Sequence, residues 1–175
     1  MARVVLVRGV NVGGHRTFRP AALARKLKRL DVVNVGAAGT FVVRSSATRA
    51  ELRAELARTL PFEAEVVICE GREFMRMVAS DPFAGEPVRA DVVRFVSFLS
   101  RRSRAAPTTP AAFPPRGTWL LRLLASEDRF VFGLYRRHMK VIGYLGALDR
   151  MFGVPVTTRN WNTVMAIARV LSVGS

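Results

Sequence analysis

The sequence has few of the residues on which metal sites and many catalytic sites depend. Its 175 residues include one cysteine, Cys69, and two histidines, His15 and His138. A single thiol cannot form an internal disulfide, and these three side chains are too few for a typical four-ligand zinc site. The G-x-S-x-G segment of many serine hydrolases is also missing. We therefore expect no metal and no cofactor; no catalytic residue is indicated, and whether the protein is an enzyme stays open.

Long hydrophobic runs are missing as well. Arg3, Arg8 and Arg94 interrupt the most apolar stretches, so none reaches the roughly 18 residues that a membrane-spanning helix needs. Only Val4 to Val7 separate the first two arginines, which is too short for the apolar region of a secretory signal. We expect a cytoplasmic protein with no membrane partner. The hydrophobic fraction of 50% nevertheless predicts a packed core.

Lysine is scarce, whereas arginine is abundant. The chain has 25 Arg and 3 Lys, and its formal net charge is +15. A charge of this size is typical of proteins with an anionic partner. The arginines are spread along the whole chain, however, with clusters only at 25–29 and 101–104, and a general compositional bias would give the same distribution. Nucleic-acid binding through a dispersed Arg-rich surface is therefore an alternative hypothesis.

The first 72 residues predict a complete β-α-β-β-α-β unit. Helices are expected after Pro20, which suits a first turn, and after Thr48, which forms a capping box with Glu51. Runs rich in β-branched residues predict strands at 3–10, 32–35, 40–44 and 64–70. This order is that of the ferredoxin-like fold, in which two helices cover one face of a four-stranded sheet.

Residues 73–175 predict a second α/β subdomain. A helix is expected near 71–80, and another from Asn160 onward. Strands are expected at 92–99, 118–124 and 129–136. We therefore expect an α+β protein in which a ferredoxin-like subdomain, 1–72, packs on a second subdomain, 73–175, that is also ferredoxin-like.

The segment RGVNVGGHRTF at 8–18 is the first candidate binding segment. Its glycines permit close approach of the backbone to a ligand, and the start of the following helix attracts phosphate or carboxylate. The candidate ligand-binding residues are Arg8, Asn11, Gly13 and Gly14. The alternative is structural, with glycines that only turn the chain and an asparagine that holds the loop. The segment matches neither G-x-G-x-x-G nor the P-loop pattern.

The segment TTRNWNTV at 157–164 is the second candidate binding segment. The candidate ligand-binding residues are Arg159, Asn160, Trp161 and Asn162. The structural alternative is local: Thr158 or Asn160 caps the helix that follows, and the tryptophan packs across the domain.

These two segments also resemble the signatures of a known protein family. LVRGVNVGG at 6–14 and TTRNWNTV at 157–164 are similar to the two signatures of a bacterial family of unknown function, DUF1697, whose members begin with a segment like LLRGINVGG. The resemblance implies an α/β protein built of ferredoxin-like subdomains, and it implies no substrate, cofactor or catalytic residue. The chain departs from the commoner pattern at 36–45, where GAAGTFVVRS replaces a segment like IQSGNVVFRS.

The leading hypothesis is that the two segments form one basic cleft that binds a small anionic ligand. Both segments combine arginine and asparagine with residues that favour particular backbone conformations, such as those of turns and helix starts. Besides nucleic-acid binding, the other alternative is a structural or protein-interaction role, in which the segments only stabilise the fold. The sequence does not predict the oligomeric state.

Overall fold

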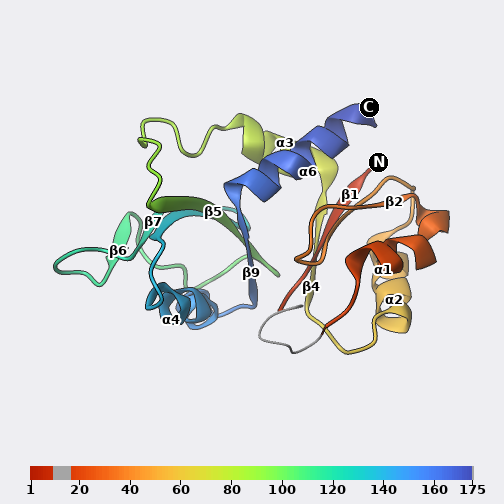
Figure 1. Ribbon diagram of the computed structural model, residues 1–175, viewed down its shortest axis with the longest axis horizontal. Coiled ribbons are helices and arrows are strands. Elements are labelled where there is room, and N and C mark those ends of the chain that lie inside the picture. Colours follow the sequence, from red (N-terminus) through yellow and green to blue (C-terminus); the bar gives the residue numbers. More distant parts are fainter. Residues whose placement is uncertain (10–16, 175) are drawn as a thin grey trace. The chain divides into compact units, whose positions relative to one another are not determined.

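The computed structural model describes residues 1–9 and 17–174, which form two compact units (Figure 1). The first unit comprises Met1–Ala79 and Met165–Ser175, and the second comprises Ser80–Val164. Each holds an antiparallel sheet and helices, so the predicted α+β class is confirmed. The boundary expected between residues 72 and 73 falls inside a helix of the first unit, α3 (Gly71–Ala79).

The first unit has the predicted β-α-β-β-α-β order. Its elements before α3 are β1 (Arg3–Val7), α1 (Pro20–Lys26), a 3-10 turn (Lys28–Leu30), β2 (Val32–Asn34), β3 (Thr40–Val43), α2 (Arg49–Thr59) and β4 (Val66–Glu70). The sheet order is β2-β3-β1-β4, and every neighbouring pair is antiparallel. The capping box at the start of α2 is confirmed, because Thr48 Oγ1 accepts from the backbone of Glu51 and the glutamate carboxylate accepts from the backbone of Thr48.

Helices α1 and α2 cover one face of this sheet (Figure 1). Leu23 and Leu27 near α1 and Leu52 and Leu56 of α2 are all buried in one apolar cluster with the sheet. The strand residues of this cluster are Val5, Val7, Phe41, Val43, Val66 and Ile68. Complete burial of a side chain of this size contributes roughly 1.5–3 kcal/mol, so this cluster is the main source of stability of the first unit.

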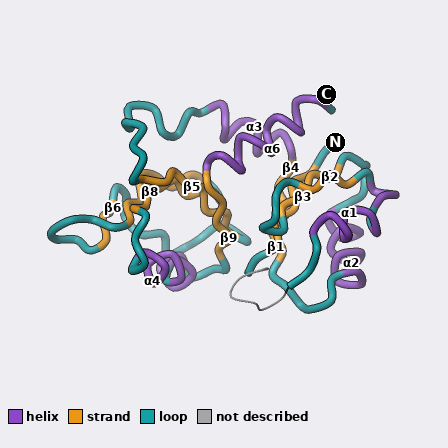
Figure 2. Tube along the Cα trace, in the orientation of Figure 1, coloured by secondary structure: helices purple, strands orange, loops and turns teal. Residues whose placement is uncertain are grey.

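The second unit contains a five-stranded sheet of order β6-β7-β8-β5-β9 (Figure 2). Its elements are β5 (Val92–Leu99), β6 (Ala111–Phe113), β7 (Leu121–Glu127), β8 (Phe130–Arg136), α4 (Val141–Gly146), α5 (Leu148–Phe152), β9 (Val156–Asn160) and the start of α6 (Trp161–Val173). The expectation of a second ferredoxin-like order is not confirmed, because four strands precede the first helix of this unit. The prolines of the 100–120 segment disfavour a helix there, and only the short edge strand β6 forms.

Strand β5 lies between β8 and β9 and positions the site described below. Helices α4 and α5 pack on one face of the sheet, where Val141, Leu148 and Phe152 form a cluster with Phe95. β9 pairs with β5 only from Val156, opposite Leu99, to Asn160, opposite Phe95. Residues 92–94 of β5 therefore extend past the end of β9.

Candidate functional site

A pocket of about 370 Å³ opens in the second unit where β9 ends. This volume lies within the range of small-molecule sites in proteins. Three of the four residues predicted from the RNWNT segment line it: Asn160, Trp161 and Asn162. The other lining residues come from the start of β5, the segment before it and the end of β8: Pro87, Val88, Arg89, Val92, Val93, Arg94, Tyr135 and Arg137.

The end of the β5–β9 ladder forms part of this pocket. The backbone of Leu99 donates to Arg129 on the β8 side, whereas that of Ser100 donates to Pro155 on the β9 side. Because the hydrogen-bonding direction alternates along an antiparallel strand, Arg94 directs its N–H and C=O toward the β9 side. Phe95 and Asn160 therefore form a non-hydrogen-bonded pair of this ladder, in which the Arg94 carbonyl lies opposite the N–H of Trp161.

The start of α6 also lines the pocket. Asn160 caps this helix, because its Oδ1 accepts a hydrogen bond from the backbone N–H of Thr163 at 2.9 Å. The N–H of Asn162 belongs to the first turn and has no carbonyl partner within the helix. Trp161 packs edge-on against Phe83, with ring centroids 5.0 Å apart. The structural alternative is therefore right for Asn160, which also lines the pocket.

Two arginines of the lining have no carboxylate partner among the described residues. Arg137 Nε donates to the carbonyl of Ala90 at 3.3 Å, and Arg94 Nη2 donates to the carbonyl of Glu86 at 2.7 Å. Neither guanidinium forms an ion pair within residues 1–9 and 17–174. None of the lining residues that the structure describes is acidic.

Arg89, the third arginine of the lining, shares the carboxylate of Asp91 with Arg136, whose Nη1 lies 3.0 Å from Asp91 Oδ2. The guanidinium of Arg89 donates to both carboxylate oxygens of Asp91, at 3.1 and 3.0 Å. These hydrogen bonds hold the pKa of Asp91 below its ordinary value. The guanidinium of Arg94 lies 5.6 Å from the ring centroid of Phe83, on the sheet face opposite Tyr135, so Arg137 is the cation available to a ligand beside Tyr135.

Tyr135 adds a neutral hydroxyl group to the lining. Its ring lies near that of Phe95, with centroids 5.7 Å apart. Burial raises the pKa of the Tyr135 hydroxyl above its ordinary value, although the charge of Arg137 acts in the opposite direction. The phenol is protonated at neutral pH and can donate a hydrogen bond to an anion.

Arg159, the fourth residue predicted from the RNWNT segment, does not line this pocket. It is 9% exposed, and its Nη1 donates to the carbonyl of Thr158 at 2.9 Å. Burial lowers the pKa of Arg159 to about 10, so the guanidinium stays charged at pH 7. Its place on β9 explains its burial: alternate side chains of a strand point to opposite faces of the sheet.

The other candidate segment belongs to the first unit. Arg8 follows β1, is half-buried and donates its backbone N–H to Glu65 at 2.9 Å. Asn11, Gly13 and Gly14 lie outside the described residues. The ligand-binding role of this segment, and the cleft shared with RNWNT, stay predictions.

The part of the chain that the structure describes shows no group of three or more His, Cys, Asp or Glu side chains that could hold a metal ion. Nor does any described helix combine the length and the apolar character that crossing a membrane requires.

The sequence analysis did not predict three residues that line the pocket: Arg94, Tyr135 and Arg137. The only feature of the sequence that could have indicated them is the basic pair Arg136 and Arg137 at the end of a predicted strand.

Comparison with known proteins identifies the family. The profile of the family described as "Protein of unknown function (DUF1697)" matches residues 1–115. The chain belongs to this family. The matched range contains the RGVNVGG segment, whereas the RNWNT segment lies beyond it. No curated protein matches this DUF1697 member.

A solved structure has the same fold. It is that of the conserved bacterial protein SP0830 from Streptococcus pneumoniae, with a TM-score of 0.62 and 17% sequence identity. The match covers 97% of this DUF1697 chain and 98% of the other. At this identity the likeness shows the fold alone.

Proposed function

We propose that this protein binds a small anion, carrying a phosphate or carboxylate group, in the pocket of its second unit. The supporting observation is that Arg137, which has no carboxylate partner within the described residues, and the neutral hydroxyl of Tyr135 line one pocket. An anion bound beside Arg137 accepts a charge-assisted hydrogen bond from its guanidinium and a second hydrogen bond from the Tyr135 hydroxyl. Asn162, which is exposed and lies in the first turn of α6, adds its side-chain amide and its backbone N–H as further donors.

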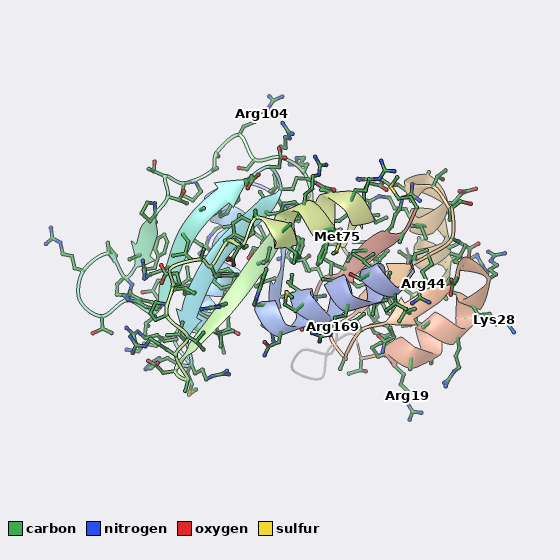
Figure 3. The ribbon with its side chains drawn as sticks, turned by 90° about the horizontal axis from the view of Figure 1, so that it is seen from above. Arg19, Lys28, Arg44, Met75, Arg104 and Arg169 are labelled. Carbon is green, nitrogen blue, oxygen red and sulfur yellow. The ribbon has the colours of Figure 1, made fainter. Side chains whose placement is uncertain are left out.

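The experiment is a thermal-shift titration with inorganic phosphate, citrate and acetate, carried out on the parent protein and two variants. Arg137→Ala removes a cation of the pocket. Arg104→Ala removes an exposed arginine of the same unit that does not line it (Figure 3). A ligand at 100 times its dissociation constant adds about 2.7 kcal/mol of stability, which is a shift of roughly 5–11 °C for a chain of this size.

We expect the shift to disappear in Arg137→Ala and to persist in Arg104→Ala. A shift that both variants lose equally, or that neither loses, contradicts the pocket as the binding site. If no anion shifts the parent protein, anion binding by this protein is wrong.

Nucleic-acid binding is the second candidate. It is supported by the net charge of +15 and by exposed arginines around the 100–120 segment, namely Arg101, Arg104 and Arg116. Phosphate-backbone contacts release counterions, so affinity for an oligonucleotide then falls steeply with salt. Binding that depends on salt and is equally strong in Arg137→Ala supports this candidate. Substitutions in RNWNT that lower stability and change no binding support a structural role.

A further inference from the structure

We propose that the exposed face of helix α4 contacts an anionic lipid surface. This inference does not depend on the anion site proposed above, and none of the residues on which it rests lines that pocket. Only Ala147 separates α4 from α5 (Figure 1). The backbone N–H of Ala147 donates to Gly143 and that of Met151 donates to Ala147, so the helical repeat continues across the join. The two helices therefore present one continuous inner face and one continuous outer face.

The inner face of this helical segment packs on the sheet. Val141, Leu148 and Phe152 follow one another at the spacing of one helical face, and all three are buried in the cluster with Phe95. A helix that is held on a core in this way normally carries charged or polar side chains on its outer face.

The outer face of α4 carries no charged or polar side chain. Four residues at the spacing of one helical face are exposed there, and we call them the apolar face: Met139, Ile142, Gly143 and Gly146. Met139 is 86% exposed and Ile142 is 71% exposed. A Cβ atom at either glycine would meet nothing within 4 Å, so the described chain leaves this face open. Exposed apolar patches with a polar rim mark contacts with another protein or with a membrane.

The rim of the apolar face is positively charged. Lys140 lies at its start, and Arg150 continues the same face in α5. Both side chains are exposed, and neither forms an ion pair within residues 1–9 and 17–174. Asp149 is the only acidic residue of α4 and α5, and its Oδ1 accepts from the backbone N–H of Val156 at 2.9 Å.

Charge and size together favour a lipid surface over a protein. A second copy of the chain would bring the same cations together across a symmetric contact, and two chains with a net charge of +15 repel each other. A stable protein interface uses roughly 20–30 residues a side, whereas the apolar face has four. An anionic bilayer attracts the cations, and the boundary of its acyl chains accepts exposed aliphatic side chains without a matching shape.

This contact differs from the membrane partner that the sequence analysis expected to be absent. That expectation rested on the lack of an apolar run long enough to span a bilayer. A surface contact needs no such run, because the side chains enter only the boundary between headgroups and acyl chains. Two apolar side chains and two cations give a reversible contact.

The experiment is co-sedimentation at physiological salt with two kinds of vesicle, one of phosphatidylcholine alone and one of three parts phosphatidylcholine to one part phosphatidylserine. The test variant combines Met139→Ser with Ile142→Ser. The control is Val173→Ser, which changes an exposed valine of the first unit. We expect the parent protein to bind the phosphatidylserine vesicles, the double variant to bind them at least about fivefold more weakly, and the control to bind them as the parent does. Exposed substitutions change stability little, which the melting temperatures check.

The net charge would by itself draw the protein to anionic vesicles, so charge has its own control. Lys140→Glu and Arg104→Glu change the net charge equally, and Arg104 is an exposed residue of the same unit outside the apolar face. We expect Lys140→Glu to weaken binding more. An environment-sensitive fluorophore on Met139→Cys is expected to shift to the blue on phosphatidylserine vesicles, and the same label on Arg104→Cys is not. Cys69 is buried, so the label enters at the new thiol.

Three results overturn the inference. If the parent protein binds neither kind of vesicle, the inference is wrong. If the double variant binds as the parent does and the two charge variants lose affinity equally, adsorption follows net charge alone. If sedimentation velocity shows a dimer of the parent protein and a monomer of the double variant, the apolar face joins two copies instead. The phosphate titration of Arg137→Ala decides the anion site separately.

Discussion

The ring of Phe95 lies against the bare Cα of Gly133, its register partner on the neighbouring strand. A Cβ atom at position 133 would lie 2.6 Å from Cε1 of that ring and 2.7 Å from the backbone oxygen of Arg122. Phe95 is fully buried and belongs to the cluster with α4 and α5. The glycine therefore allows the close approach of β5 and β8 at this pair.

We expect Gly133→Ala to destabilise the protein by about 2–3 kcal/mol, because neither a fully buried ring nor a backbone carbonyl can move without strain. Urea denaturation measures this loss. Gly143→Ala is the matched control: position 143 lies within helix α4, and a Cβ there meets nothing within 4 Å. Alanine in a helix is favoured over glycine by roughly 0.5–1 kcal/mol, so the control is expected to gain stability. Equal effects of the two substitutions would contradict this account.

Glu70 makes the stability of the first unit depend on pH. Its Oε1 accepts from Arg3 Nε at 3.2 Å and from Arg49 Nε at 3.0 Å. Burial raises the pKa of this carboxyl group, but the two hydrogen bonds outweigh burial and hold the pKa below the ordinary value of 4.5. A carboxyl group with a lowered pKa in the folded state stabilises it above pH 4.5, and this contribution is lost as the pH falls further.

We therefore expect Glu70→Gln to lower the melting temperature at pH 6–7 and the difference from the parent protein to shrink as the pH falls below 4.5. Thermal melts at a series of pH values check this. Glu63→Gln removes the same charge from an exposed position that has no hydrogen bond or ion pair within the described residues. A pH-independent difference for Glu70→Gln, or the same profile for Glu63→Gln, refutes the linkage.

Local patterns were enough to predict the first unit. Its strands alternate with helices whose starts are marked by Pro20 and by the capping pair of Thr48 and Glu51, and each signal lies within a few residues. The second unit depends on pairings between distant segments. Val93 lies opposite Tyr135 only because β5 and β8 are neighbours, and no local pattern announces that register.

The candidate site shows the same limit. Asn160 and Asn162 were predicted from the chemistry of one short segment, and both line the pocket. The arginines at 94 and 137 reach the pocket through sheet register, so the sequence alone did not reveal them. Strand β9 was also not predicted, and the alternation of side chains that buries Arg159 follows from it.

Arg159 is expected to act on stability and not on the ligand of the pocket. Arg159→Ala removes a buried side chain whose guanidinium holds the carbonyl of Thr158. We expect a loss of about 2–4 kcal/mol, as for other large-to-small substitutions in a core. The dissociation constant for phosphate, measured by calorimetry well below the melting temperature, is expected to stay within twofold. A large loss of affinity without a loss of stability would instead place this guanidinium on the ligand.

Asn160 has two roles that two substitutions can separate. It caps α6 through its Oδ1, and it lines the pocket. Asp caps a helix as well as Asn does and interacts favourably with the helix dipole, whereas Ala loses the cap at a cost of about 1 kcal/mol. Asn160→Asp is therefore expected to keep the stability of the parent protein, and Asn160→Ala to lower it.

The order of the two variants reverses for ligand binding. The aspartate carboxylate shares the pocket with the bound anion, and two like charges about 5 Å apart repel by roughly 1–3 kcal/mol at a partly exposed site. Phosphate affinity is thus expected to fall about 5- to 100-fold in Asn160→Asp, and less in Asn160→Ala. Urea denaturation and calorimetry on both variants check the two orders. If Asn160→Asp binds phosphate as tightly as the parent protein, the anion does not lie beside the start of α6, because a new negative charge there must weaken it.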